Sequence, residues 1–69
     1  MREKLEALIE EMLDKGILYE EAKREFERRF IQRALARSRG NISRATELLG
    51  LHRNTLSRKL TEYRMKRTG

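Results

Sequence analysis

Glycines interrupt the apolar periodicity of this chain at Gly16, Gly40 and Gly50, and no proline occurs among its 69 residues. Between these glycines, apolar side chains recur at steps of three and four residues. That spacing is typical of amphipathic α-helices, and glycine accommodates the left-handed backbone with which many helices end. The pattern therefore predicts an all-α fold of four helices, over about residues 2–15, 19–38, 44–49 and 53–66.

The two short helices of the C-terminal half have recognisable caps and apolar sides. Ser43 is a suitable N-cap for the third helix, and Thr46 in place of Glu leaves its capping box incomplete. We expect the last three residues, 67–69, to fray. The apolar sides are expected to consist of Ala45, Leu48 and Leu49 in the third helix and Leu56, Leu60 and Tyr63 in the fourth.

The first two helices carry longer apolar stripes than a two-helix hairpin can cover. A chain of this length is one small domain that buries only about 60% of the surface its unfolded form exposes, so a lone subunit would be marginally stable. We therefore expect these helices to pair with those of a second copy in a dimeric four-helix bundle; the alternative is a monomeric core. The expected dimer interface comprises Leu5, Leu8, Ile9, Met12, Leu13, Phe26 and Phe30.

Positive charge is concentrated in the second half of the chain. Residues 1–32 contain seven Lys or Arg and nine Asp or Glu, whereas residues 33–69 contain ten and two, for a net charge of +6 overall. A one-sided positive field favours polyanionic partners, nucleic acid first and an anionic membrane surface second. A basic surface without a partner is the third possibility.

Several classes of function find no support in the residues. With one histidine and no cysteine, the chain offers no nucleophile–base pair and no metal-ligand set, so we expect neither an enzyme nor a cofactor. No apolar run is long enough to span a bilayer, and the N-terminus does not resemble a signal peptide. We expect a cytoplasmic protein without a membrane partner, and its 41% of charged residues is a mix common in thermophiles.

Residues 40–60 place two short helices on either side of a tight turn at Gly50, the arrangement of a helix-turn-helix. With Leu56 pointing inward, a helical wheel places four polar residues of the last helix roughly opposite: Asn54, Ser57, Arg58 and Thr61. The early residues of such a recognition helix reach base edges in the major groove, where Arg suits guanine and Asn suits adenine. The expected base-reading residues are His52, Arg53, Asn54 and Ser57. A solvated amphipathic helix is the alternative.

The segment RGNISRATELLGLHRNTLSRKL resembles the Fis-type helix-turn-helix. It looks most like the C-terminal DNA-binding domain of NtrC-type enhancer-binding activators. The resemblance is strongest from Phe26 to Tyr63. The positions that match the family pattern are Gly40–Asn41, Leu49–Gly50, Arg53, Thr55–Leu56 and Lys59–Leu60.

The resemblance implies a homodimer that sets two recognition helices into successive major grooves of a near-palindromic double-stranded site, often bending the DNA. Arg53 would then contact a base, although Ser57 stands where Fis has a groove-reading arginine, which would shift base reading towards His52 and Asn54. The residues expected to hold phosphates are Asn41, Ser43, Arg44, Thr55, Arg58 and Lys59.

Within the family, we expect one domain, with dimerisation helices over 1–38 and the helix-turn-helix over 40–66, cut from a longer bacterial activator. No ATP-binding loop motif occurs, so contact with sigma-N polymerase would require upstream domains. A free-standing Fis-like DNA-bending protein is one alternative. A helical protein–protein dimerisation module with a basic tail is another, and RNA binding is weaker because no aromatic residue interrupts the basic cluster.

Overall fold

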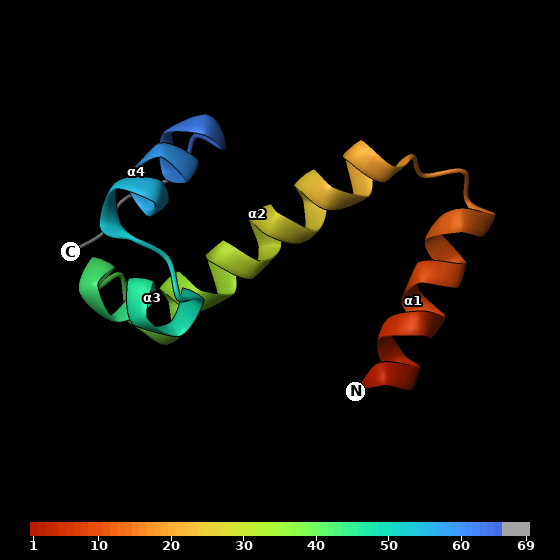
Figure 1. Ribbon diagram of the computed structural model, residues 1–69, viewed down its shortest axis with the longest axis horizontal. Coiled ribbons are helices and arrows are strands. Elements are labelled where there is room, and N and C mark those ends of the chain that lie inside the picture. The colour runs from red at the N-terminus through yellow and green to blue at the C-terminus, as the bar shows by residue number, and fades with distance from the viewer. Residues whose placement is uncertain (66–69) are drawn as a thin grey trace.

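The computed structural model describes residues 1–65, which form four helices and no strand. They are α1 (Arg2–Asp14), α2 (Tyr19–Arg37), α3 (Ile42–Leu49) and α4 (Arg53–Glu62). Helix α3 packs against the C-terminal half of α2, and α4 packs against α3 (Figure 1). The all-α prediction is therefore confirmed, and α3 and α4 form a helix-turn-helix. None of the described helices is both long and apolar enough to cross a membrane.

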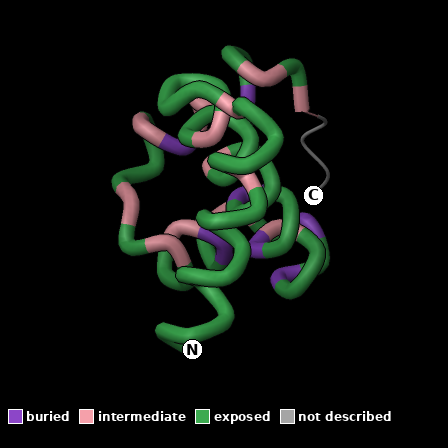
Figure 2. Tube along the Cα trace, turned by 90° about the vertical axis from the view of Figure 1, so that its right-hand side faces the viewer, coloured by how far each residue is buried: buried purple, intermediate pink, exposed green. Residues whose placement is uncertain are grey.

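A small core holds α2, α3 and α4 together. Ile31 of α2, Ala45 of α3, and Leu56 and Leu60 of α4 are each at most 2% exposed and form one cluster. Figure 2 shows how few residues are buried and that they lie in this part of the chain. Helix α1 contributes no buried residue and lies apart from the other three helices (Figure 1). Helix α4 is thus held in place by α2 and α3, without buried residues from α1.

The predicted apolar side of α3 was wrong at one position. Leu48 is 52% exposed, whereas Ala45 is fully buried and Leu49 half-buried. Ile42, at the start of the helix, packs against the core instead. Residues 42, 45 and 49 lie three and four residues apart on one face, and position 48 falls towards solvent because α4 approaches from the other edge of that face.

The beginning of α3 also differs from the prediction. Helix α3 starts at Ile42 rather than after Ser43, and its N-cap is Asn41, whose Oδ1 accepts a 3.1 Å hydrogen bond from the backbone N–H of Arg44. Asparagine caps helices as well as serine does, and the glycine before it leaves room for the chain to turn. The hydroxyl of Thr46 donates to the carbonyl of Ser43 at 2.6 Å, a bond back to its own helix.

Helix α4 ends four residues earlier than predicted, at Glu62. Arg64 takes a left-handed φ of 53°, and the N–H of Met65 reaches back to the carbonyl of Leu60 at 2.8 Å, a Schellman termination. Residue 66 and the predicted fraying of residues 67–69 lie outside the described residues. Periodicity alone missed this end because Tyr63 continues the apolar stripe beyond the last helical residue.

The turn between α3 and α4 depends on Gly50. Its φ is 67°, and the N–H of Leu51 closes the turn on the carbonyl of Thr46 at 3.1 Å. A Cβ at this position would meet no atom within 4 Å, so the constraint comes from the backbone conformation and not from crowding.

Replacing Gly50 by Ala should lower the free energy of unfolding by about 1 to 2 kcal/mol, the cost of a left-handed residue with a Cβ. Gly50→Asn should cost less, because asparagine tolerates this conformation. Urea unfolding followed by circular dichroism measures both, with Glu47→Ala, an exposed helical position, as the control. Equal stability of the Ala and wild-type proteins would show that the turn does not require glycine.

Candidate nucleic-acid interface

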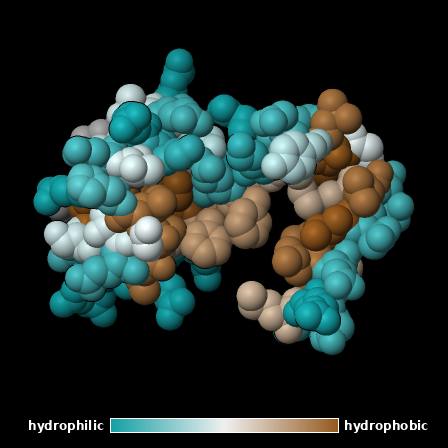
Figure 3. Space-filling model, viewed as in Figure 1, coloured by the Kyte–Doolittle hydropathy of each residue, from teal (hydrophilic) through white to brown (hydrophobic). Residues whose placement is uncertain are grey.

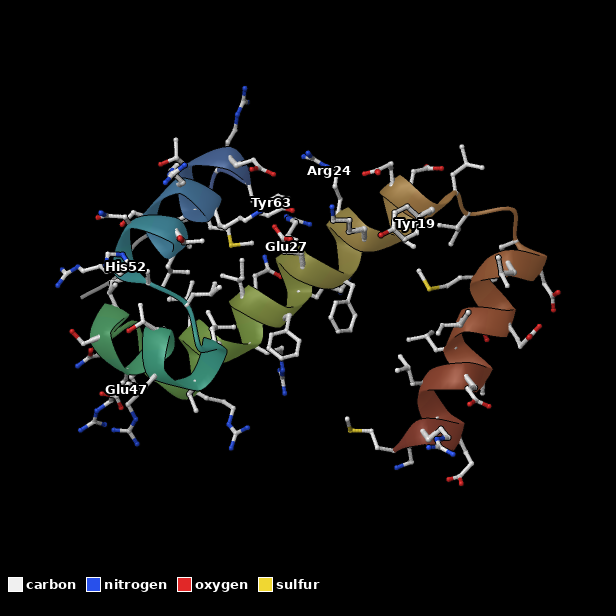
Figure 4. All side chains as sticks on the ribbon, viewed as in Figure 1. Tyr19, Arg24, Glu27, Glu47, His52 and Tyr63 are labelled. Atoms are coloured by element: carbon white, nitrogen blue, oxygen red, sulfur yellow. The ribbon has the colours of Figure 1, made fainter. Side chains whose placement is uncertain are left out.

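Several polar residues of α4 lie on the side of the helix that faces away from the core. Arg53, Asn54 and Arg58 are exposed, and Thr55 and Ser57 are half-buried. His52, which begins the helix, projects to the outer side of the helix-turn-helix in Figure 4. The exposed Ser43 and Arg44 stand at the start of α3. The structure thus leaves an open polar surface on α4, as expected for a recognition helix.

His52 has a structural task in addition to any contact with DNA. Its Nδ1 accepts a 3.1 Å hydrogen bond from the backbone N–H of Asn54 and so caps α4. The capping role requires an unprotonated Nδ1. Only Nε2 is then available for a ligand, so the ring can form a hydrogen bond with DNA only from its Nε2 side.

Lys59 differs from the other predicted phosphate ligands in where it points. It lies on the side of α4 that faces α2, and its Nζ is 2.8 Å from Oε1 of Glu27, with both side chains about one-third exposed or less (32% and 26%). Arg58, the preceding residue, is exposed. Lys59 therefore stays a predicted phosphate ligand, but in this structure its ammonium is bound to a carboxylate.

Glu27 is the centre of a polar cluster between α2 and α4 that the sequence did not reveal. The hydroxyl of Tyr63 donates to its Oε1 at 2.7 Å. Arg24, one turn earlier on α2, lies over the Tyr63 ring at 5.2 Å and 3.8 Å from Glu62 (Figure 4). One signal was present in the sequence: Glu27 precedes the buried Ile31 by four residues, so an acid stands on the core-facing side of α2 and needs a partner.

The cluster shifts the pKa values of its members. The hydrogen bonds from Lys59 and then from Tyr63 lower the pKa of the Glu27 carboxyl below its usual value, and the bond to Glu27 raises the pKa of Lys59. Burial, followed by the bond to Glu27, raises the pKa of Tyr63 to about 12. At neutral pH the cluster consists of a carboxylate, an ammonium and a neutral phenol, the combination that makes charge-assisted hydrogen bonds.

An apolar groove of about 880 Å³ opens between α1 and α2. Figure 3 shows hydrophobic side chains along the inner sides of both helices, on either side of the opening. The rings of Phe26 and Phe30 lie side by side in a tilted arrangement, with centroids 5.5 Å apart, and the two residues remain 57% and 52% exposed. All seven residues expected in the dimer interface line the groove: Leu5, Leu8, Ile9, Met12, Leu13, Phe26 and Phe30. The described residues of one chain do not cover this surface.

Two short helices are joined by a tight turn at a glycine, and the second of them has an exposed polar face. This arrangement defines the class of protein, a helix-turn-helix DNA-binding domain. The family model for "Bacterial regulatory protein, Fis family" matches residues 23–63, and the chain belongs to that family. The match covers α4, α3 and nearly all of α2, the helices that share the core.

Two relatives carry names that bear on the role of the domain. The chain is 47% identical over 45 residues to the "DNA-binding transcriptional regulator NtrC" of Azospirillum brasilense, covering 65% of this chain and 9% of that protein. It is 46% identical over 50 residues to a "Putative Fis-like DNA-binding protein" of Xylella fastidiosa (strain Temecula1 / ATCC 700964), covering 72% of this chain and 56% of that protein. No solved structure matches. The chain thus spans only part of both relatives, a small part of the first.

Acid should destabilise the protein through Glu27. Because the folded-state pKa of this carboxyl lies below the ordinary value of 4.5, its contribution to stability is complete above that pH and is lost as the pH falls through the folded pKa. Glu27→Gln should lower the free energy of unfolding by about 1 kcal/mol at neutral pH and flatten its decrease below pH 4.5.

Urea titrations at several pH values measure this difference. The matched control is Glu25→Gln, which removes an exposed ion pair with Arg29 on the same helix. A Glu27→Gln protein with wild-type stability at neutral pH and a wild-type acid profile would contradict the prediction.

Proposed function

We propose that this chain binds double-stranded DNA sequence-specifically, as a homodimer at near-palindromic sites, and serves as the DNA-binding domain of a transcriptional regulator of the NtrC type. The observation that carries the proposal is the exposed face of α4, where Arg53, Asn54 and Arg58 stand free of the core on the second helix of a Fis-family helix-turn-helix. Arginine and asparagine there have the bidentate geometry that reads guanine and adenine.

The open apolar groove supports the homodimer. An apolar surface of this extent costs free energy in water, and a second copy would supply the same stripes of α1 and α2 by symmetry. In such a dimer, each α4 would enter its own half-site. The spacing between half-sites would then follow from the distance between the two recognition helices.

The wider role follows the named relatives. An NtrC-type regulator would act at enhancer sites and engage sigma-N RNA polymerase through domains other than this one. A free-standing Fis-like DNA-binding protein is the second candidate, favoured by the Xylella relative, more than half of which this chain covers. Both share the same interface with DNA.

Selection of bound duplexes from a random pool tests the proposal. We expect enrichment of a two-fold-related pair of half-sites at a fixed spacing. A protein–protein dimerisation module would enrich no sequence, and neutralising α4 would leave its association unchanged.

Replacing Arg53 by Ala should weaken binding to the selected duplex by about 1 to 3 kcal/mol and relax the preference at one position of each half-site, because the arginine is expected to contact a base there. Fluorescence anisotropy with the selected duplex and single-position variants measures both effects. The control Lys15→Ala removes the same charge from the end of α1, where it pairs only with Glu11 among the ion pairs of the described residues. Equal weakening on every duplex would make Arg53 a phosphate ligand.

Replacing Phe26 by Asp should give monomers with far weaker binding to the selected duplex, since it places a charge in the middle of the apolar groove. Sedimentation equilibrium measures the mass. Leu18→Asp is the matched control, because Leu18 is 68% exposed and does not line the groove. A wild-type protein that sediments as a monomer at tens of micromolar would exclude the dimer.

A further inference from the structure

One carboxylate connects α2 to the last turn of α4 and to the residue that caps its C-terminus. Oε1 of Glu27 lies 2.8 Å from the Lys59 ammonium and accepts a hydrogen bond of 2.7 Å from the Tyr63 hydroxyl. Lys59 and Tyr63 are four residues apart, so both project from the same side of α4, towards α2. Arg24 adds a second connection to the end of α4, at 3.8 Å from Glu62.

These contacts add a directional restraint to the orientation of α4, which the apolar core fixes by burial. Leu56 and Leu60 hold α4 in place by burial, which is strong but has little directional preference. Hydrogen bonds weaken steeply when their geometry changes. Two such bonds reach Oε1 of Glu27, from Lys59 near the end of α4 and from the capping residue Tyr63, and together they oppose rotation of α4 about its own axis. Such a rotation would carry Arg53, Asn54 and Arg58 away from their places on the exposed face.

The same contacts change what Lys59 can do for DNA. To neutralise a phosphate, the Lys59 ammonium would have to leave Glu27. The carboxylate would then face the negative field of the DNA with Tyr63 as its remaining hydrogen-bond donor among residues 1–65. Arg58 has no such constraint among the ion pairs of residues 1–65. Two neighbouring cations on one helix therefore have different positions and different expected roles.

We propose that Glu27 positions the recognition helix by binding Lys59 and Tyr63, and that Lys59 acts in DNA binding through the orientation of α4 and not by neutralising a phosphate. The inference rests on the proposed function, because it assigns tasks within the same DNA interface. Glu27, Lys59 and Tyr63 are positioning residues in this assignment, and Arg58 is the phosphate ligand.

The salt dependence of binding distinguishes a cation that neutralises a phosphate from one that orients α4. Each phosphate that a protein neutralises contributes about 0.9 to the slope of log affinity against log salt. Lys59→Met should weaken binding to the selected duplex with an unchanged slope, whereas Arg58→Met should reduce the slope by about 0.9 for each subunit on the DNA. A Lys59→Met slope reduced by that amount would overturn the proposal and make Lys59 a phosphate ligand.

The ratio of specific to non-specific affinity separates positioning from mere stability. Glu27→Gln and Tyr63→Phe should each lower the preference for the selected duplex over a scrambled duplex of equal length by about five-fold or more, the discrimination of one base-pair contact. Glu20→Gln, the same change at an exposed position of α2 that does not line the groove, should leave the preference unchanged. An unchanged preference in the two cluster variants, measured well below their melting temperatures, would reduce the cluster to a stabilising contact.

Reversal of the ion pair provides a rescue. Glu27→Lys and Lys59→Glu should each lower the preference for the selected duplex. The double variant should regain most of this preference, because α2 and α4 again carry opposite charges, with the two signs exchanged. No recovery in a double variant with wild-type far-UV circular dichroism would contradict positioning by this pair. Tyr63→Phe, which removes a single hydroxyl, provides the measurement if the swapped proteins fail to fold.

The outcomes distinguish this inference from the proposed function. If the wild type enriches no duplex from the random pool and binds the scrambled one equally well, the proposed function fails. If the wild type discriminates but the cluster variants discriminate equally well, only the positioning role of Glu27 fails.

Discussion

The structure depends on the packing of Leu56 and Leu60 of α4 against Ile31 of α2 and Ala45 of α3. Ala45 is completely buried, and its small side chain lets the helices approach closely. Because so few side chains are buried, each one has a large share in fixing the orientation of α4. This core both stabilises the helix-turn-helix and holds the polar face of α4 towards solvent, and the Fis-family match covers the same helices.

The molecule is divided into a part that completes its own core and a part that does not. Helices α2, α3 and α4 share the buried cluster, whereas α1 has no buried residue and leaves an apolar groove of about 880 Å³ against α2. Helix α2 belongs to both parts. Ile31 belongs to the core, and Phe26 and Phe30 line the groove, so a partner seated in the groove would be connected to α4 through one continuous helix.

Much of this arrangement follows from local sequence, because the signals act over a few residues. Apolar steps of three and four, with left-handed glycines at positions 16 and 50, predicted all four helices and the tight turn. The errors arose where two local signals competed. Asn41 and Ser43 are both good N-caps, and the asparagine was overlooked although it follows Gly40. Tyr63 extended the apparent stripe of α4 beyond a Schellman turn for which Arg64, a residue without glycine's freedom, supplies the left-handed conformation.

The sequence by itself determined the helices, the family and the polar composition of α4, since these depend on residue type and spacing. Only the tertiary structure decided which polar side chains are committed to other parts of the chain. It pairs Lys59 with Glu27 across 32 positions of sequence and leaves the neighbouring Arg58 exposed. It also turned Leu48 to solvent and brought Ile42 into the core. Such choices depend on the angles at which helices cross, and those are set by contacts between residues far apart in the chain.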